Sequence, residues 1–189
     1  MKLKLRTVVL IILLVVVSLI IHEIYTRFKP VNTIYFRGSP YSFRQDVRRA
    51  LKVEVFPSED FIHKLFHDYK IKNVTILFKP GSPETNSLYQ VETFEIVYKL
   101  TRYDMATRRI FAPKKTFSAE PIESYENITR EEGVLKIILV PPEFSNQTRV
   151  VGGGNRIWIY GRSDEEFDLA TIRAILSVMN ITSIEGYKG

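Results

Sequence analysis

The most prominent pattern in the chain is an uncharged apolar run near its start. Residues 7–21 (TVVLIILLVVVSLII) carry no charge, and three basic residues precede them within the first six positions. Fifteen helical residues span roughly 22 Å, less than a hydrocarbon core of roughly 30 Å, but residues 5–25 reach about 31 Å. The pattern therefore predicts a transmembrane helix over residues 7–25, after a basic segment 1–6.

A cleaved secretory signal and a buried soluble helix are two other interpretations of this run. Cleavage requires small residues after the apolar region, whereas residues 18–25 (SLIIHEIY) offer branched and bulky ones after Ser18. A soluble helix would leave one modest domain to cover a nearly all-round apolar cylinder. We therefore expect an uncleaved signal anchor, followed by a separate domain over residues 26–189.

The orientation of this anchor is argued from glycosylation sequons, because basic residues flank both of its ends. Four of the seven Asn residues begin an Asn-x-Thr sequon, where about one is expected by chance. All four lie beyond the anchor, as glycosylation outside the cell requires: Asn73, Asn127, Asn146 and Asn180. Turn or helix-end chemistry is the alternative role, which Asn180 also fits. We predict a single-pass cell-membrane protein with a cytoplasmic amino terminus and an exterior, glycosylated domain.

Alternation of apolar and polar residues predicts most of the strands in the domain. Residues 134–140 (VLKIILV) are almost continuously apolar and branched, which is typical of a central strand covered on both faces. Residues 92–102 alternate large apolar side chains with polar ones, which predicts a half-buried strand. The predicted strands are 32–37, 71–79, 92–102 with 108–112 as its hairpin partner, 134–140 and 156–160.

Helices are predicted where a capping residue precedes an apolar stripe. Ser42 and Ser58 precede two such stripes, and a capping box from Ser163 to Glu166 precedes a segment that is apolar round most of its circumference. The predicted helices are 43–51, 59–69 and 164–179, and the polar connections are 81–87 (GSPETNS) and 118–133. Together the patterns predict an α+β fold: one mixed domain with a largely antiparallel sheet and a C-terminal helix packed on it.

Composition narrows the chemistry that the chain can perform. The absence of Cys excludes disulfides, thiol catalysis and Cys-ligated zinc or iron–sulfur clusters. Three Gln, three Met and no Cys, against 48 charged residues (27 basic and 21 acidic), are typical of heat-adapted chains and point towards an archaeal source.

The net charge of +6 belongs mostly to the amino-terminal segment. Residues 1–29 contribute five basic residues and one acidic residue, or +4, so residues 30–189 carry only +2. Within the domain, residues 30–115 carry +6 and residues 116–189 carry −4. We favour ordinary solvated charge over a basic half that faces lipid headgroups. The predicted partner is the lipid bilayer and not a nucleic acid.

His63 and His67 are the one chemically suggestive pair. They lie four residues apart on a predicted helix, so they share a face and could bind one metal ion, with Asp60 as a third ligand. In the zinc-protease pattern a Glu follows the first His, but Lys64 stands there, so that mechanism is absent. We favour a solvated pair beside the apolar stripe of this helix.

Two further motifs are better explained by structure than by chemistry. The glycines at 152–154 lead into a strand and lack a Lys, so a turn is favoured over a phosphate loop. Residues 161–165 (GRSDE) resemble half of a nucleophile elbow, but Glu165 replaces the second Gly and Ser163 serves as a helix cap. The single Trp158 is explained by core packing. No catalytic residue and no cofactor is predicted.

The sequence therefore predicts a location more sharply than an activity. Our leading hypothesis is a membrane-anchored, extracytoplasmic module for binding or assembly at the cell envelope, with an envelope protein as partner. A membrane-anchored hydrolase that uses His63 or His67, with or without a metal, is the first alternative. An accessory subunit of a larger membrane complex is the second.

Overall fold

The computed structural model describes residues 13, 15–17, 31–108 and 114–184. The chain divides into two compact units, Met1–Pro30 and Val31–Gly189, which are considered separately. In the first unit the described residues 13 and 15–17 are helical, and their side chains are exposed. The rest of the predicted anchor at residues 7–25 lies outside the described residues. Within the described part, no helix has both the length and the apolar character that crossing a bilayer demands.

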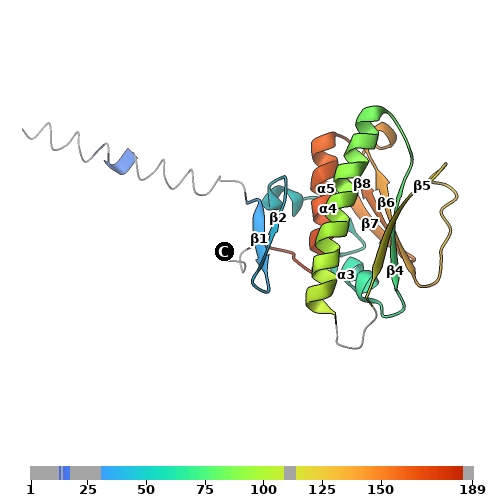
Figure 1. Ribbon diagram of the computed structural model, residues 1–189. Helices are drawn as coiled ribbons and strands as arrows, with labels where there is room; N and C mark the ends of the chain where they lie inside the picture. Colours follow the sequence, from blue (N-terminus) through green and yellow to red (C-terminus); the bar gives the residue numbers. More distant parts are fainter. Residues whose placement is uncertain (1–12, 14, 18–30, 109–113, 185–189) are drawn as a thin grey trace, which may run out of the picture. The chain divides into compact units, whose positions relative to one another are not determined.

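The second unit is built on a six-stranded, mostly parallel sheet (Figure 1). The strand order is β3-β7-β8-β6-β4-β5, and the one antiparallel pair within this sheet is β7–β8. Its strands are β3 (Glu54–Phe56), β4 (Asn73–Phe78), β5 (Thr116–Pro121), β6 (Val134–Val140), β7 (Arg149–Gly153) and β8 (Arg156–Tyr160). The α+β class is confirmed, but the expectation of a largely antiparallel sheet is wrong.

The reason for this error is helix α4 (Pro83–Thr107), which occupies the segment predicted as a strand over residues 92–102. Two helical pairs four residues apart interleave there: Phe94 and Tyr98 are exposed and stacked, while Ile96 and Leu100 are buried. Read along the chain, the interleaved pairs imitate the period of a strand. With a helix between them, β4 and β5 form a crossover unit, which requires parallel strands.

The start of α4 also corrects the predicted loop over residues 81–87. The Ser82 hydroxyl accepts a hydrogen bond from the Thr85 backbone N–H, and Pro83 occupies the first helical turn. This arrangement of a Ser cap followed by Pro is a standard helix start.

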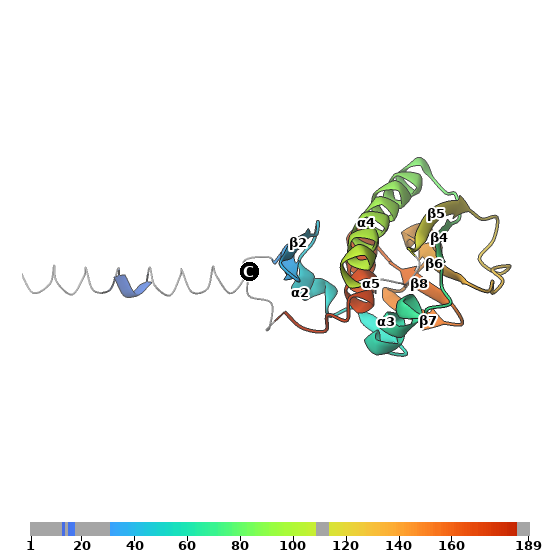
Figure 2. The ribbon, with the colours of Figure 1, turned by 60° about the horizontal axis from the view of Figure 1, so that its bottom comes forward.

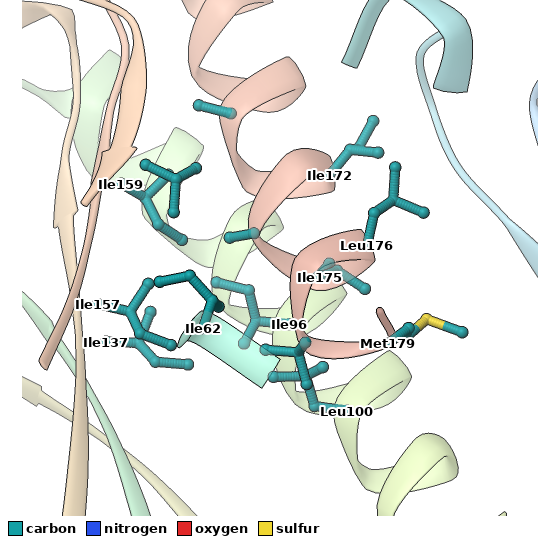
Figure 3. Close-up of a cluster of buried hydrophobic side chains, with 14 of the residues drawn as sticks. Ile62, Ile96, Leu100, Ile137, Ile157, Ile159, Ile172, Ile175, Leu176 and Met179 are labelled. Carbon is teal, nitrogen blue, oxygen red and sulfur yellow. The ribbon is translucent and has the colours of Figure 1, made fainter. Parts of the chain in front are cut away.

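Two other helices form as predicted and pack on the same face of the sheet as α4 (Figures 1 and 2). Ser58 caps α3 (Glu59–His67), and Ser163 caps α5 (Asp164–Val178). Figure 3 shows part of the core, with Ile137, Ile157 and Ile159 on the sheet side of α5 and Ile172 and Leu176 on its outer side. The members of the core that the figure labels are Ile62, Ile96, Leu100, Ile137, Ile157, Ile159, Ile172, Ile175, Leu176 and Met179.

The opposite face of the sheet is covered by a second, smaller apolar cluster. The segment between β5 and β6 contributes Tyr125 and Ile128, and the short helix η1 (Pro142–Phe144) contributes Phe144. Trp158 of β8 is half-buried in this cluster and stacks on Tyr160. Residues on both faces of β4 and β6 are therefore buried, as the nearly continuous apolar sequence of β6 predicted.

An additional layer covers the side of the helices that faces away from the sheet (Figure 2). It consists of the hairpin of β1 (Thr33–Phe36) and β2 (Ser39–Ser42), followed by α2 (Val47–Ala50), which is shorter than the predicted 43–51. The guanidinium of Arg37 donates to the carbonyl oxygen of Ala106 at 2.7 Å. Arg102 donates to the carbonyl oxygen of Pro40 at 3.1 Å, so side chains from both partners fix the hairpin on α4.

The glycine run at residues 152–154 ends β7 in a tight hairpin. Gly154 and Asn155 both have positive φ (55° and 61°), as a two-residue type I′ turn requires, and Gly153 pairs with Arg156. The run is therefore a turn, in agreement with the sequence analysis.

Replacement of Gly161 by Ala is expected to destabilise the domain by about 2 kcal/mol. A Cβ at Gly161 would overlap the backbone of α5, including the Phe167 nitrogen at 2.6 Å, because β8 and α5 meet there without an intervening side chain. Urea unfolding measures the loss, with Gly153→Ala as the control, since a Cβ at Gly153 meets no atom within 4 Å. Equal stability of the two variants would contradict this close contact.

Candidate functional site

An apolar groove lies between α4 and the edge of the sheet formed by β4 and β5. Its volume is about 580 Å³. The sheet contributes Phe78 and Ala119, the connection between β4 and α4 contributes Pro80, and α4 contributes Asn86, Tyr89, Gln90, Thr93, Phe94 and Val97. The polar groups among these residues are amides and hydroxyls, so the described lining of the groove contains no carboxylate, amine, imidazole or guanidinium.

The groove exists because a small residue occupies the edge strand opposite the helix. In the parallel register Val74 and Ile76 of β4 lie beside Phe117 and Ala119 of β5. Val74 and Ile76 are buried on the helix side, so Phe117 and Ala119 face the same side. Ala119 carries only a methyl group and remains exposed, which leaves the space between β5 and α4 unfilled.

The floor of the groove is held rigidly. The Phe78 and Tyr89 rings pack with their centroids 5.1 Å apart. The Tyr89 hydroxyl donates to the carbonyl oxygen of Lys79 at 2.8 Å and lies 3.2 Å from the Tyr125 hydroxyl. Burial raises the pKa of Tyr89, so its hydroxyl stays neutral and acts as a fixed anchor for the floor.

The rim of the groove continues into an exposed apolar stripe on α4. Phe94 is 67% exposed, and Val91 and Tyr98 lie one turn to either side of it. The Arg102 guanidinium, 5.4 Å from the centroid of the Tyr98 ring, ends the apolar stripe on that side. The Phe94 and Tyr98 rings are stacked, with centroids 5.8 Å apart. Contiguous apolar surface of this kind marks interaction sites more often than a single exposed side chain does.

A buried ionic cluster occupies another side of α4, where it meets α5 and the segment after β2. Lys99 pairs with Glu95 one turn away, and Arg44 lies 3.8 Å from Glu92 and 3.7 Å from Asp168. We call the following residues the ionic cluster: Arg44, Glu92, Glu95, Lys99, Asp168 and Thr171.

The ionic cluster contains three carboxylates and two cations. Both carboxylate oxygens of Glu92 are buried, and neither accepts a hydrogen bond from the described residues. Burial, reinforced by the nearby Asp168 charge, raises the pKa of Glu92 from 4.5 to about 8. Burial also raises the pKa of Asp168. Glu92 is therefore protonated at neutral pH, so the two remaining carboxylates balance the two cations. The cluster also links the outer layer, through Arg44, to α4 and α5.

The structure keeps His63 and His67 together on α3, with ring centroids 4.4 Å apart. Each ring already has a protein partner. His63 Nδ1 lies 2.7 Å from the Val178 carbonyl oxygen, and His67 Nε2 lies 3.0 Å from the Tyr103 hydroxyl. Partial burial lowers the pKa of His67 to about 4, so it is neutral at pH 7.

Metal binding by these histidines stays a prediction. Asp60, the third ligand considered from the sequence, pairs instead with Lys64. In residues 31–108 and 114–184, no group of three His, Cys, Asp or Glu side chains is arranged to hold a metal ion. The described side chains therefore offer two nitrogen ligands without a third.

The carboxyl ends of the parallel strands are the usual ligand site of such sheets, but here the chain's own acids occupy them. Glu143 accepts a hydrogen bond from the Ser82 backbone N–H at the start of α4, which lowers the pKa of Glu143. The first turn of α5 contains Asp164, Glu165 and Glu166. Both positive helix ends are thus already neutralised, which disfavours an anionic ligand there.

The four sequon asparagines are all exposed in the structure. Asn73 begins β4, where its side-chain oxygen accepts a hydrogen bond from the Thr116 hydroxyl. Asn180 has a φ of 58° immediately after α5, so the helix-end role is confirmed for this residue. Exposure is compatible with glycosylation, which stays a prediction for all four.

The groove is the feature that sequence analysis missed. Its signal was present in the helical spacing of Val91, Phe94 and Tyr98, but Phe94 and Tyr98 were assigned to a strand over residues 92–102. Comparison with protein families, curated proteins and solved structures finds no match for this chain.

Proposed function

We propose that this protein is a membrane-anchored, extracytoplasmic binding module of the cell envelope, and that the groove between α4 and β5 is its binding surface. The carrying observation is the exposed, stacked pair of Phe94 and Tyr98 beside an apolar hollow of about 580 Å³. Exposure of such a stripe is unfavourable in water, so a partner that covers it gains the free energy of burying both rings.

The chemistry of the groove supports binding over catalysis. Its polar side chains are neutral: Asn86, Gln90, Thr93 and Tyr89. The Tyr89 hydroxyl is already engaged by the chain itself. A hydrolase would need a base that activates a nucleophile towards a bound substrate, and the described residues that line the groove supply no such base.

The proposed location depends on the sequence. The apolar run over residues 7–21, with the helical, exposed residues 13 and 15–17 inside it, supports an anchor over residues 7–25. Exposure of all four sequon asparagines supports an exterior domain. An accessory subunit of a larger membrane complex would use the same groove, and its partner would then be a subunit of that complex.

A photo-cross-linking amino acid at position 94 is expected to capture a partner protein in native membranes. Position 94 lies on the rim of the groove, so a bound partner must come within reach of it. The matched control places the same amino acid at Phe56, which is 60% exposed on β3 at the opposite edge of the sheet. Mass spectrometry of the adducts measures the outcome.

Adducts at position 94 that disappear when Ala119 is replaced by Trp would support the groove, because the indole fills it. Equal labelling from positions 94 and 56, or adducts unaffected by Ala119→Trp, would overturn the groove as binding surface. Release of the full chain from membranes by carbonate washing would overturn the anchor.

A further inference from the structure

We infer that the partner enters the groove as an extended peptide that adds to β5 as a further strand, with apolar and basic residues in alternation. This inference rests on the proposed function and specifies the partner of the same site. Three features of the described residues support this inference: the free edge of β5, the groove on the helix side of that edge, and acidic residues on the opposite face of β5.

The open edge is β5, which pairs with β4 on one side only. The backbone N–H groups of Thr116 and Ile122 donate towards β4, to the carbonyl oxygens of Lys72 and Phe78. Because these groups alternate along a strand, the N–H and C=O groups of Phe117 and Ala119 point to the free edge. Pro121 follows at the next outward position, where the absence of an N–H removes no bond to β4.

The hollow lies on the helix side of this edge, at Ala119. A strand paired with β5 would direct every second side chain to the helix side, towards Phe94 and Val97. A large apolar side chain at such a position would fill the groove, while the backbone of the same residue bonded to β5. This combination of main-chain pairing and a side-chain pocket is the general mode of strand addition.

The other face of β5 favours a basic partner. Ser118 and Glu120 are exposed there, and the chain continues through the exposed Glu123 and Glu126. Cross-strand pairs of opposite charge are favourable, so Lys or Arg is expected at the alternate positions of the peptide. A second copy of this chain paired through β5 would instead bring acidic residues together, which disfavours self-association.

The test uses a fluorescent octapeptide, Lys-Val-Lys-Leu-Lys-Val-Lys-Leu, and the full chain in a neutral detergent. Fluorescence anisotropy is expected to show saturable binding that weakens at least tenfold for the Ala119→Trp variant. The matched control is Glu54→Trp, which adds the same exposed indole to the opposite edge strand, β3, and should bind as the wild type does. Circular dichroism checks that both variants are folded.

Four peptide variants separate strand addition from non-specific attraction and require no change in the protein. The block peptide Lys-Lys-Lys-Lys-Val-Leu-Val-Leu has the same composition without alternation, and a Glu-for-Lys peptide reverses the charge. Both should bind at least tenfold more weakly. Two further peptides carry methyl groups on alternate backbone nitrogens, one at the odd-numbered residues and one at the even-numbered residues. One of these two peptides should lose binding and the other should keep it, because only one edge of the peptide pairs with β5.

Equal binding of the block peptide, or full binding of both methylated peptides, would overturn the inference. A dimer that Ala119→Trp dissociates would show that the occupant is a second copy, which also overturns it. If position 94 cross-links to a partner but the alternating peptide does not bind, the proposal of a binding module is supported and only the inference of an extended peptide is overturned. If position 94 captures no partner and the alternating peptide does not bind, the proposed function is overturned as well.

Discussion

Replacing Glu92 with Gln is expected to raise the free energy of unfolding near pH 8 by roughly 3 to 5 kcal/mol, while leaving it nearly unchanged near pH 5. The pKa of Glu92 is about 8 in the folded protein and near its ordinary 4.5 in the unfolded chain. The folded state therefore binds more protons between these values, so stability falls as pH rises from about 4.5 to about 8. Gln keeps the shape of the protonated side chain without the cost of ionisation.

Urea unfolding of both proteins at a series of pH values measures this effect. The groups that face Glu92 are Arg44, Glu95, Asp168 and Thr171, and the first of these partly compensates its charge. The matched control is Glu84→Gln on the exposed first turn of α4, which should show no difference that grows with pH. Superimposable stability curves for Glu92→Gln and the wild type would mean that Glu92 is already ionised in the folded state.

Replacing Arg173 with Ala is expected to destabilise the domain by about 3 kcal/mol. The Arg173 side chain is almost fully buried in α5, where it pairs with Glu59 at the start of α3. Its Nε donates to the carbonyl oxygen of Val53 at 3.1 Å. Truncation therefore leaves a partly buried carboxylate without its cation and a carbonyl without its donor.

The size of this loss is checked against an exposed ion pair at the start of the same helix. Arg162 pairs with Glu166 through two hydrogen bonds, but its side chain is 65% exposed, so Arg162→Ala should cost at most about 1 kcal/mol. The double replacement Arg173→Met with Glu59→Gln should recover part of the loss, because it removes both charges. Equal effects of Arg173→Ala and Arg162→Ala in urea unfolding would contradict the structural role of Arg173.

The parts of the fold that were predictable are those whose signals are local. Ser58 and Ser163 cap their helices as expected because a cap depends on the next three residues alone. Strand β6 was recognisable because burial on both faces leaves an apolar run without period. These elements needed no knowledge of their neighbours in space.

The direction of the sheet and the groove were not predictable in the same way. Helix α4 is apolar on a buried face at Ile96 and Leu100 and on an exposed face at Phe94 and Tyr98, so no single helical stripe appears in the sequence. The ionic side of α4 was not recognisable either, because Glu92 and Lys99 look like solvent-exposed residues in the sequence but are buried in the folded domain. One misassigned helix then changed the predicted strand pairing from parallel to antiparallel.

Strand β5 was also missed, for a different physical reason. Its residues are mostly exposed because it lies at an edge, so Thr116–Pro121 lacks the apolar content by which a buried strand is recognised. Its conformation is imposed by pairing with β4, and the sequence alone does not encode that pairing. The hollow at Ala119 depends on both missed elements, which is why the candidate site became visible only in the structure.

The attachment of Val31 to the rest of its unit has a mechanical consequence. Its N–H donates to Asp46 at 3.1 Å, and its carbonyl oxygen accepts from the Val47 N–H at 2.8 Å. Tension applied to the chain at Val31 must therefore shear these bonds and then detach the β1–β2 hairpin from α4, where Arg37 and Arg102 fasten it. The hairpin and α2 come before the six-stranded sheet along the chain, so strain applied at Val31 would load the outer layer before it reached the sheet and the groove.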